Sequence, residues 1–413
     1  MAIGQGVHQI ISPAGDDALR GYATYPVASA GFLALSLVVP FFELKPNRIA
    51  SGFPVWAWSS PWSMAAIILL LLTEIYALFN LKRKLAIAGS FRPWITAAMQ
   101  VFSWLVFFTA MTGSAALVEK AGTAGMSMQR LSPSSGFWLA LMGSFLAGRW
   151  SRIQFQRSVW LRAAMALGFT AAMVLAWRLG ALERFSPWLE LRAQGSRFMA
   201  ELARHVVLTL GSFAFALVVG VLGAVMLSRG TRTGRLLGMA AGALQNIPSL
   251  ALFGLLLPAM AALADALPFL RNAGVSGIGF APAFIALAIY ALLPVMLAGA
   301  AGLSMVDAGA RDAAKGMGMN RLQVLLRVEL PLALPAIAGG ARTALVQTVG
   351  TTTVAALIGA GGLGYFVFQG VGQAAMDMVI IGVVPIVALS VLADRLMASL
   401  ERHLSANGGA LWR

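Results

Sequence analysis

The sequence predicts an all-α polytopic membrane protein with about ten transmembrane helices. Hydrophobic residues make up 59% of its 413 residues and charged residues only 11%, whereas charged residues make up about 25% of a typical soluble protein. The charged residues are also widely spaced, so the apolar runs between them are long enough to help cross a bilayer. Most of the chain must therefore be embedded in lipid, which excludes a soluble cytosolic enzyme.

The apolar runs give the order of the predicted spans. Five lie in the first part of the chain, near residues 22–42, 62–79, 93–117, 135–148 and 161–177. Five more follow, near residues 206–227, 236–262, 281–303, 340–357 and 378–393. Residues 181–204 mix aromatic and aliphatic side chains with charges at nearly every turn, which is typical of a helix at the membrane interface. We therefore expect an N-terminal extension at 1–180, an interfacial amphipathic linker at 181–204, a core domain at 205–400 and a tail at 401–413.

The formal net charge of +15 raises the question of a nucleic-acid partner. The Lys and Arg residues do not cluster as they do in such proteins, but lie mostly in short links between the apolar runs. Cationic loops stay on the cytoplasmic side of a membrane. With both termini in the cytoplasm, 20 of the 30 Lys and Arg residues fall inside. The charge therefore predicts orientation in a lipid bilayer, with no nucleic-acid partner.

Catalytic and metal centres are not indicated by the residue types. The chain has no cysteine, and its histidines, His8, His205 and His403, are far apart in sequence, so a thiolate or histidine metal site is not expected. No lysine follows a glycine, and the phosphate-binding P-loop is therefore missing. We expect a protein that is not an enzyme and has no cofactor of its own.

The link at residues 304–335 has helical patterning of its own, and connections of this length are usually functional. Gly318 can end a first short helix in the left-handed conformation. Asn320, with Gln323 three residues later, can cap a second. Pro331 and Pro335 then restrict how the chain re-enters the membrane.

This link carries the most specific motif. Asp312-Ala313-Ala314, then Gly318, then Val328-x-Leu330-Pro331 resemble the EAA motif of ABC importer permeases, with Asp312 in place of the usual Glu and Val328 in place of the usual Ile. The wider stretch, from about residue 201 to 398, most resembles permeases that import glycine betaine, choline or carnitine. The first 180 residues lie outside this resemblance.

The resemblance implies a five-helix type I ABC importer permease core, similar to methionine permeases, in a bacterial inner membrane. It also implies a cytoplasmic ABC ATPase dimer that binds ATP and Mg, an extracytoplasmic substrate-binding protein, and a second permease chain of the same or another kind. Substrate would cross by alternating access. The residues implied to couple the permease to the ATPase are Asp312, Ala313, Ala314, Gly318, Val328, Leu330 and Pro331.

Polar residues inside the core spans predict a translocation path, because polar groups persist in lipid only where protein or water receives them. One group surrounds a proline, another lies on successive turns of one span, and a tyrosine offers a ring to a quaternary ammonium. The alternative interpretation is hydrogen bonding between helices and core packing. The candidate path residues are Gln245, Asn246, Pro248, Ser249, Tyr290, Gln347, Thr348, Thr351 and Thr352.

The glycine run at 359–364 disfavours a continuous helix, because each glycine costs about 1 kcal/mol relative to alanine. We expect a flexible outer turn that forms a gate or a docking surface, with close packing as the alternative. The residues are Gly359, Gly361, Gly362 and Gly364. Arg342 is expected to reach the coupling link or lipid phosphates.

Two alternative functions are considered for this chain. The same architecture can import an amino acid or another small cation. An ion-coupled secondary transporter is less favoured, because such carriers often place acidic residues at helix breaks inside the membrane. The predicted core spans have none between their ends.

Overall fold

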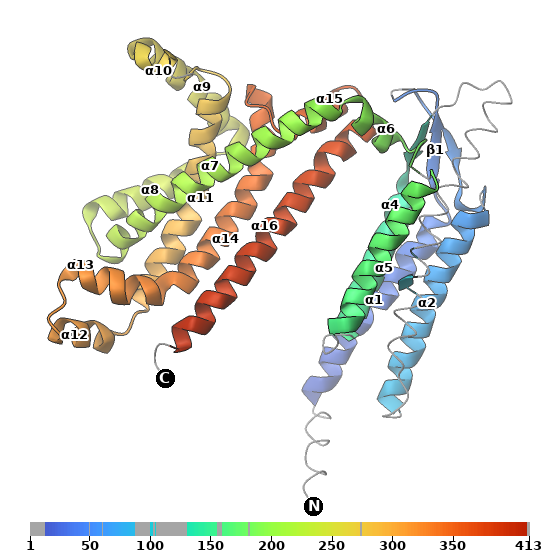
Figure 1. The fold of residues 1–413 in the computed structure, drawn as a ribbon, viewed down its shortest axis with the longest axis horizontal. Helices are drawn as coiled ribbons and strands as arrows, with labels where there is room; N and C mark the ends of the chain where they lie inside the picture. Colours follow the sequence, from blue (N-terminus) through green and yellow to red (C-terminus); the bar gives the residue numbers. More distant parts are fainter. Residues whose placement is uncertain are drawn as a thin grey trace, which may run out of the picture. The chain divides into compact units, whose positions relative to one another are not determined.

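The computed structural model describes residues 13–48, 50–59, 61–86, 100, 101, 104, 130–154, 159–180, 182–272 and 275–410. The chain forms two compact units, Met1–Arg192 and Ala193–Arg413 (Figure 1). Each unit has its own buried core.

The first unit combines helices with a small sheet. Its long helices are α1 (Pro13–Ser36), α2 (Pro61–Ala86), α4 (Ser135–Gln154) and α5 (Val159–Arg178). Its strands are β1 (Phe42–Lys45), β2 (Phe53–Val55) and β3 (Arg130–Pro133), which form an antiparallel sheet in the order β2-β1-β3. A 3-10 turn, Ala57–Ser59, precedes α2, and α6 (Ser186–Ala193) closes the unit.

The sheet differs from the all-α expectation. The first span was predicted to extend to Phe42, but α1 ends at Ser36 and Phe42 begins β1. Pro40 cannot continue a helix, and the two valines before it favour extended backbone. The Phe41 amide donates to the Val55 carbonyl at 2.8 Å. Phe42 is then buried against Phe137 of α4, with ring centroids 5.6 Å apart.

The predicted five-helix extension stays a prediction. Its span at 93–117 lies outside the residues that the structure describes, apart from 100, 101 and 104. Within the described part of the chain, the five helices long and apolar enough to cross a membrane all belong to the second unit. They span Gly195–Ser228, Ser249–Ala266, Phe280–Ser304, Arg321–Ile358 and Met376–Ser405.

The second unit contains the predicted core. Its long helices are α7 (Gly195–Ser228), α8 (Arg232–Gln245), α9 (Ser249–Ala266), α11 (Phe280–Ser304), α14 (Leu330–Ala355) and α16 (Met376–Ala410). Short helices connect them: α10 (Pro268–Asn272), α12 (Ala308–Gly316), α13 (Arg321–Val324) and α15 (Gly364–Gly372). Within this unit, α12, α13 and the end of α16 lie at one end, and α10 and α15 at the other (Figure 1).

Helix α11 is the centre of this unit. In the most apolar 18-residue stretch of α11, 56% of the residues are buried. The corresponding share is 22 to 33% in the other four candidate membrane spans. Small residues let its neighbours approach closely. A Cβ on Gly220 of α7 would lie 2.8 Å from the Val295 side chain, and one on Gly340 of α14 would lie 2.7 Å from the Pro294 carbonyl oxygen. The core therefore depends on contacts among α7, α11 and α14.

Three predicted elements have different boundaries. Residues 181–204 do not form one interfacial helix: they include α6 and the first turns of α7, which is continuous from Gly195 to Ser228. The bent helix expected at 236–262 is broken into α8 and α9 at residues 246–248. The second short helix of the link is not separate either. It joins α14 through a π-helical turn, in which the Leu330 amide donates to the Leu325 carbonyl.

Helix α6 is held to the sheet by a buried acid. The Glu190 side chain is only 2% exposed. Arg48 donates from Nη1 to Glu190 Oε1 at 2.9 Å, and Arg130 of β3 donates to Oε2 at 3.2 Å. The two guanidinium groups compensate the buried carboxylate, which would otherwise be too costly to remove from water.

We expect Glu190→Ala to lower the free energy of unfolding of the first unit by about 2 kcal/mol, because two partly buried guanidinium groups lose their shared partner. Thermal unfolding of the purified protein, followed by tryptophan fluorescence, measures this. Glu183→Ala, which removes an exposed acid from the turn before α6, is the control. Equal melting temperatures for the two variants would contradict the prediction.

Candidate coupling site and translocation path

The link between α11 and α14 has the caps that its sequence predicts. Asp307 caps α12, and its side chain accepts from the Ala310 amide at 3.1 Å. Gly318 has φ +83°, which confirms the left-handed end of α12. Asn320 and Gln323 form a reciprocal capping box at 2.8 and 2.9 Å. The local shape of the link is therefore set by its own residues.

The predicted coupling residues do not all face outward. Asp312, Ala313 and Gly318 are exposed, whereas Val328, Leu330 and Pro331 are half-buried. Ala314 is only 1% exposed, so this chain's own residues cover it and it is not part of the surface that the link offers to a partner. Asp312 already pairs with Lys315, one turn away at 3.1 Å. The exposed surface of α12 is therefore carried by Asp312, Ala313 and their neighbours.

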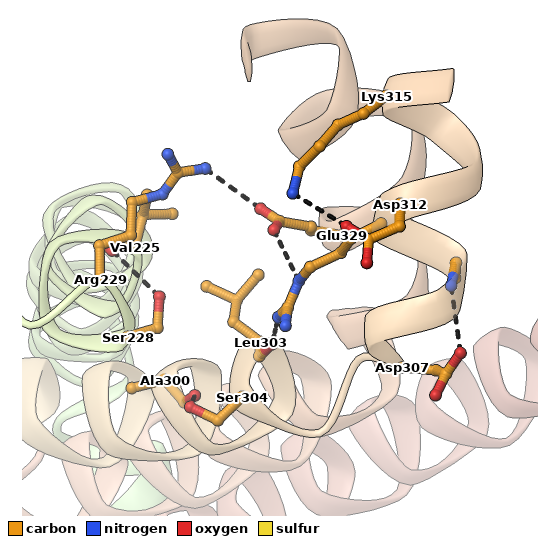
Figure 2. A network of polar contacts seen from close by, with 12 residues as sticks. Val225, Ser228, Arg229, Ala300, Leu303, Ser304, Asp307, Asp312, Lys315 and Glu329 are labelled. Carbon is orange, nitrogen blue, oxygen red and sulfur yellow. Dashed lines mark hydrogen bonds and ion pairs between the residues drawn. The ribbon is translucent and has the colours of Figure 1, made fainter. Parts of the chain in front are cut away.

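An ion-pair network, formed by Arg229, Arg311 and Glu329, connects the link to the core (Figure 2). Arg311 of α12 donates from Nε to Glu329 Oε1 at 2.9 Å. Arg229, just after α7, donates from Nη2 to Glu329 Oε2 at 3.2 Å. Arg311 also donates from Nη2 to the carbonyl of Leu303 near the end of α11. The network thus joins α7, α11, α12 and the π-helical turn before α14.

Sequence reasoning did not select Glu329, although it lies between Val328 and Leu330 of the motif. A signal was present, since Glu329 is the only acidic residue between Asp312 and Asp377. Its side chain is 13% exposed. A carboxylate at this depth needs charged or hydrogen-bonding partners, and two arginines provide them.

A hollow of about 560 Å³ lies beside α12. Its lining is mostly apolar and combines the end of α11 with α12. Met305, in this lining, is 84% exposed. The surface next to the exposed face of α12 is therefore concave and apolar, which is the shape that receives a side chain of another protein. The lining residues include Gly302, Met305, Val306, Ala310, Ala313 and Leu332.

The break between α8 and α9 is closed by Tyr290 of α11. Gln245 donates from Nε2 to the Tyr290 carbonyl at 2.7 Å. This carbonyl lacks its usual helical donor, because the residue four positions later is Pro294. In return, the Tyr290 hydroxyl donates to the Ile247 carbonyl inside the break. Gln245 and Tyr290 therefore satisfy backbone groups, which is the alternative interpretation of these two candidate path residues.

The other candidate path residues around the break, Asn246, Pro248 and Ser249, differ in exposure. Asn246 and Pro248 are exposed, and Ser249, the first residue of α9, is half-buried. These three candidate residues keep surface that is free to line a path, and none of them closes the break as Gln245 and Tyr290 do.

The polar residues of α14 separate into two faces. Thr348 and Thr352 are at most 1% exposed, and the Thr352 hydroxyl lies 2.9 Å from the hydroxyl of Thr209 on α7. Thr352 therefore contacts another helix, whereas the Thr348 hydroxyl donates to the Ala344 carbonyl of α14 itself at 2.7 Å. Gln347 is exposed and Thr351 is half-buried. The α14 face that can line a path is therefore the one that carries Gln347 and Thr351.

The glycine turn, residues 359–364, is closely packed at Gly361, Gly362 and Gly364 and open at Gly359, and a flexible gate or docking surface stays a prediction. Gly359, Gly361 and Gly362 have φ between +75° and +92°, which favours glycine. A Cβ on Gly364 would lie 1.9 Å from the Thr353 carbonyl oxygen. The Gly279 amide, at the start of α11, donates to the Ile358 carbonyl just before the turn at 2.8 Å. The turn therefore joins the ends of α11, α14 and α15.

Among the described residues, Arg342 pairs with acids of α16 and not with the link between α11 and α14. Its Nε donates to Asp394 Oδ1 at 2.7 Å, and its Nη1 lies 3.5 Å from Glu401 Oε2. Both acids lie on α16. Asp394 and Glu401 lie beyond the end of the predicted span at 378–393. They compensate the charge of Arg342, the one arginine within α14.

Comparison with known proteins gives two family matches. Residues 216–406 match the family described as binding-protein-dependent transport system inner membrane component. Residues 24–187 match the N-terminal domain of the ABC transporter permease YehY. The two matches fall within the second and first units respectively.

Individual relatives match about half of this chain. The osmoprotectant import permease protein OsmW of Salmonella typhimurium is 36% identical over 206 residues, which are 50% of this chain and 90% of that protein. The choline transport system permease protein OpuBD of Bacillus subtilis is 34% identical over 212 residues, which are 51% of this chain and 87% of that protein. A structure of the inward-facing MetNI methionine ABC transporter aligns with 50% of this chain and 95% of its own, with 22% identity and a TM-score of 0.44.

We expect Tyr290→Phe to lower the free energy of unfolding of the second unit by about 1 kcal/mol, because the Ile247 carbonyl loses its donor. Tyr365→Phe is the matched control, since the contact of Arg197 with this residue uses the ring, which phenylalanine keeps. Thermal unfolding in detergent measures both variants. A Tyr290→Phe protein as stable as the control would show that the break is closed by other contacts.

Proposed function

This chain belongs to the family of binding-protein-dependent transport inner-membrane components, and we propose that it is the permease that carries an osmoprotectant such as glycine betaine, choline or carnitine into the cell. Members of the family are non-catalytic membrane subunits of ABC importers, which work with an ATPase and a substrate-binding protein. The chain is accordingly an integral inner-membrane protein and not an enzyme. The relatives named for osmoprotectants and choline support the substrate class.

The observation that carries the coupling role is the Arg229, Arg311 and Glu329 network. The exposed face of α12, with Asp312 and Ala313, is the surface offered to the ATPase. A displacement of α12 moves Arg311, and Glu329 passes that displacement to α14 through the π-helical turn. Arg229 receives it at the end of α7. One contact with the ATPase therefore acts on three helices of the core.

The π-helical turn suits this task. It precedes Pro331, whose missing amide already weakens the helical ladder at this point. π-Helical turns often occur at functional sites within α-helices. The turn is therefore the point at which α14 can bend, so a displacement of Glu329 changes the angle at which α14 leaves the link.

The translocation path requires a second permease chain. The polar residues that keep free surface, among them Asn246, Ser249, Gln347 and Thr351, lie on the outside of this unit. In a dimer around a two-fold axis, such faces enclose a path between the chains. Substrate would then cross by alternating access between the two sides of the membrane.

The orientation follows from the same assignment. The coupling helix α12 and the end of α16 lie at one end of the second unit (Figure 1). An ATPase in the cytoplasm therefore places the C-terminus in the cytoplasm as well. The excess of cationic residues in the predicted inside links supports this orientation.

The purified chain, reconstituted in proteoliposomes with its ATPase and binding protein, is expected to take up labelled glycine betaine, choline or carnitine only when ATP is supplied to the ATPase side. Excess unlabelled amino acid should not compete. Uptake that persists without ATP and stops when ion gradients are collapsed would identify a secondary transporter. If an amino acid competed and the osmoprotectants did not, the substrate would be an amino acid, and the assignment as an ABC permease would stand.

We expect Gly318→Pro to reduce ATP-driven uptake at least about tenfold while membrane insertion is unchanged, because proline is restricted to negative φ and cannot adopt the φ of +83° found here. ATP hydrolysis should continue without transport. Gly316→Ala is the control, because Gly316 has no positive φ and a Cβ there meets no atom within 4 Å. Normal uptake by the Gly318→Pro transporter would exclude the coupling role of this link.

A further inference from the structure

The first turns of α7 contain a buried acid that the transport mechanism described above does not use. Glu201 is 5% exposed and lies two turns after the start of α7. Its Oε2 accepts from the Gly362 amide at 2.7 Å, across 161 residues of sequence. Its Oε1 is 3.4 Å from Nη1 of Arg204, whose side chain is 64% exposed. A buried carboxylate thus connects α7 directly to the backbone of the glycine turn.

The glycines of the turn are required by this contact. Gly361 and Gly362 have φ of +75° and +92°. A Cβ on Gly361 would lie 2.7 Å from Glu201 Oε2, and one on Gly362 would lie 3.3 Å from Nδ1 of His205. Only glycine lets the turn approach α7 this closely and present its amide to the carboxylate.

Further contacts connect the first turns of α7 to α14 and α15. His205, one turn after Glu201, is fully buried, and its Nε2 lies 3.2 Å from the Val349 carbonyl of α14. Above Glu201, Arg197 stacks on the Tyr365 ring of α15, with its guanidinium carbon 3.9 Å from the centroid. The contact of Glu201 and His205 with Gly361 and Gly362, here called the outer contact, therefore holds the start of α7 to the ends of α14 and α15.

We propose that Glu201 is a positioning residue that keeps the extracytoplasmic ends of α7, α14 and α15 together, and that the outer contact must separate when substrate enters. This proposal rests on the proposed transport function and specifies how its outer side is controlled. The chemistry suits a contact that opens and closes. The separation breaks one hydrogen bond from a backbone amide and two ring contacts, of Arg197 with Tyr365 and of Phe198 with Phe366.

Arg204 makes this opening feasible. A buried carboxylate that loses its partner is strongly disfavoured. Arg204 lies on the same helix as Glu201, three residues later, so it stays beside the carboxylate when the glycine turn moves away. The charge of Glu201 is therefore compensated in both arrangements, and only its hydrogen bond to Gly362 is lost on opening.

The test uses the complete transporter in proteoliposomes and three variants. Glu201→Ala removes the acceptor, and we expect ATP hydrolysis in the absence of the binding protein to rise at least about fivefold, because the outer ends separate more readily. Glu201→Gln keeps an oxygen acceptor for the Gly362 amide and should behave like the unmodified protein. Asp265→Asn, which changes an exposed acid of α9 that pairs with Arg271, is the matched control.

A distance measurement tests the contact without transport. Because the chain has no cysteine, spin labels can be placed at Ala203→Cys and Gln369→Cys, two exposed positions on α7 and α15. We expect the distance between the labels to lengthen or broaden in Glu201→Ala and to be unchanged in Asp265→Asn. If Glu201→Ala does not insert, Gly361→Ala serves instead, since its Cβ displaces the carboxylate.

Two results would overturn the proposal. An unchanged label distance means that Glu201 does not hold these ends together. A changed distance with ATP hydrolysis still fully dependent on the binding protein means that the contact is only structural. Failure of the unmodified transporter to import any of the three osmoprotectants overturns the proposed substrate instead, and the label distances report on the contact independently of that result.

Discussion

In lipid no water is available to a backbone group that loses its helical partner, and the core of this protein is organised by the way each such group is satisfied. Pro294 leaves the Tyr290 carbonyl free, and Gln245 binds it. The break before α9 leaves the Ile247 carbonyl free, and the Tyr290 hydroxyl binds it. The amide of Gly362 in the glycine turn is bound by Glu201. These three irregular points are thus each closed by a side chain from another helix.

Structural features that depend on residues close together in sequence are predicted well. The apolar runs locate α7, α11, α14 and α16, because a span is recognised by its own hydropathy. The ends of α12 and α13 follow from Gly318 and Asn320, because caps depend on residues a few positions away. The first strand is a local feature that was missed: the apolar run continues to Phe42, while Pro40 ends the helix before it.

What could not be predicted depends on partners distant in sequence. Glu190, Glu201 and Glu329 are each buried or nearly so, and each binds a group 100 or more residues away. Their residue type indicates that a partner must exist but does not identify it. Tyr290 shows the same limit: its ring suggested a cation site, while its hydroxyl is used by a carbonyl 43 residues earlier. Thr348 and Thr352 are likewise buried, and Thr352 contacts Thr209 of α7.

The length of α7 has a consequence for the membrane itself. Its 34 residues correspond to roughly 51 Å of helix, whereas the hydrocarbon core of a bilayer is about 30 Å thick. Hydrophobic mismatch of this size is relieved by tilting the helix or by leaving its terminal turns among the lipid headgroups. Glu201 belongs to those terminal turns, so the thickness and headgroup composition of the bilayer determine how much water reaches its carboxylate. The lipid around this protein is therefore one of the variables that set the strength of its outermost polar contact.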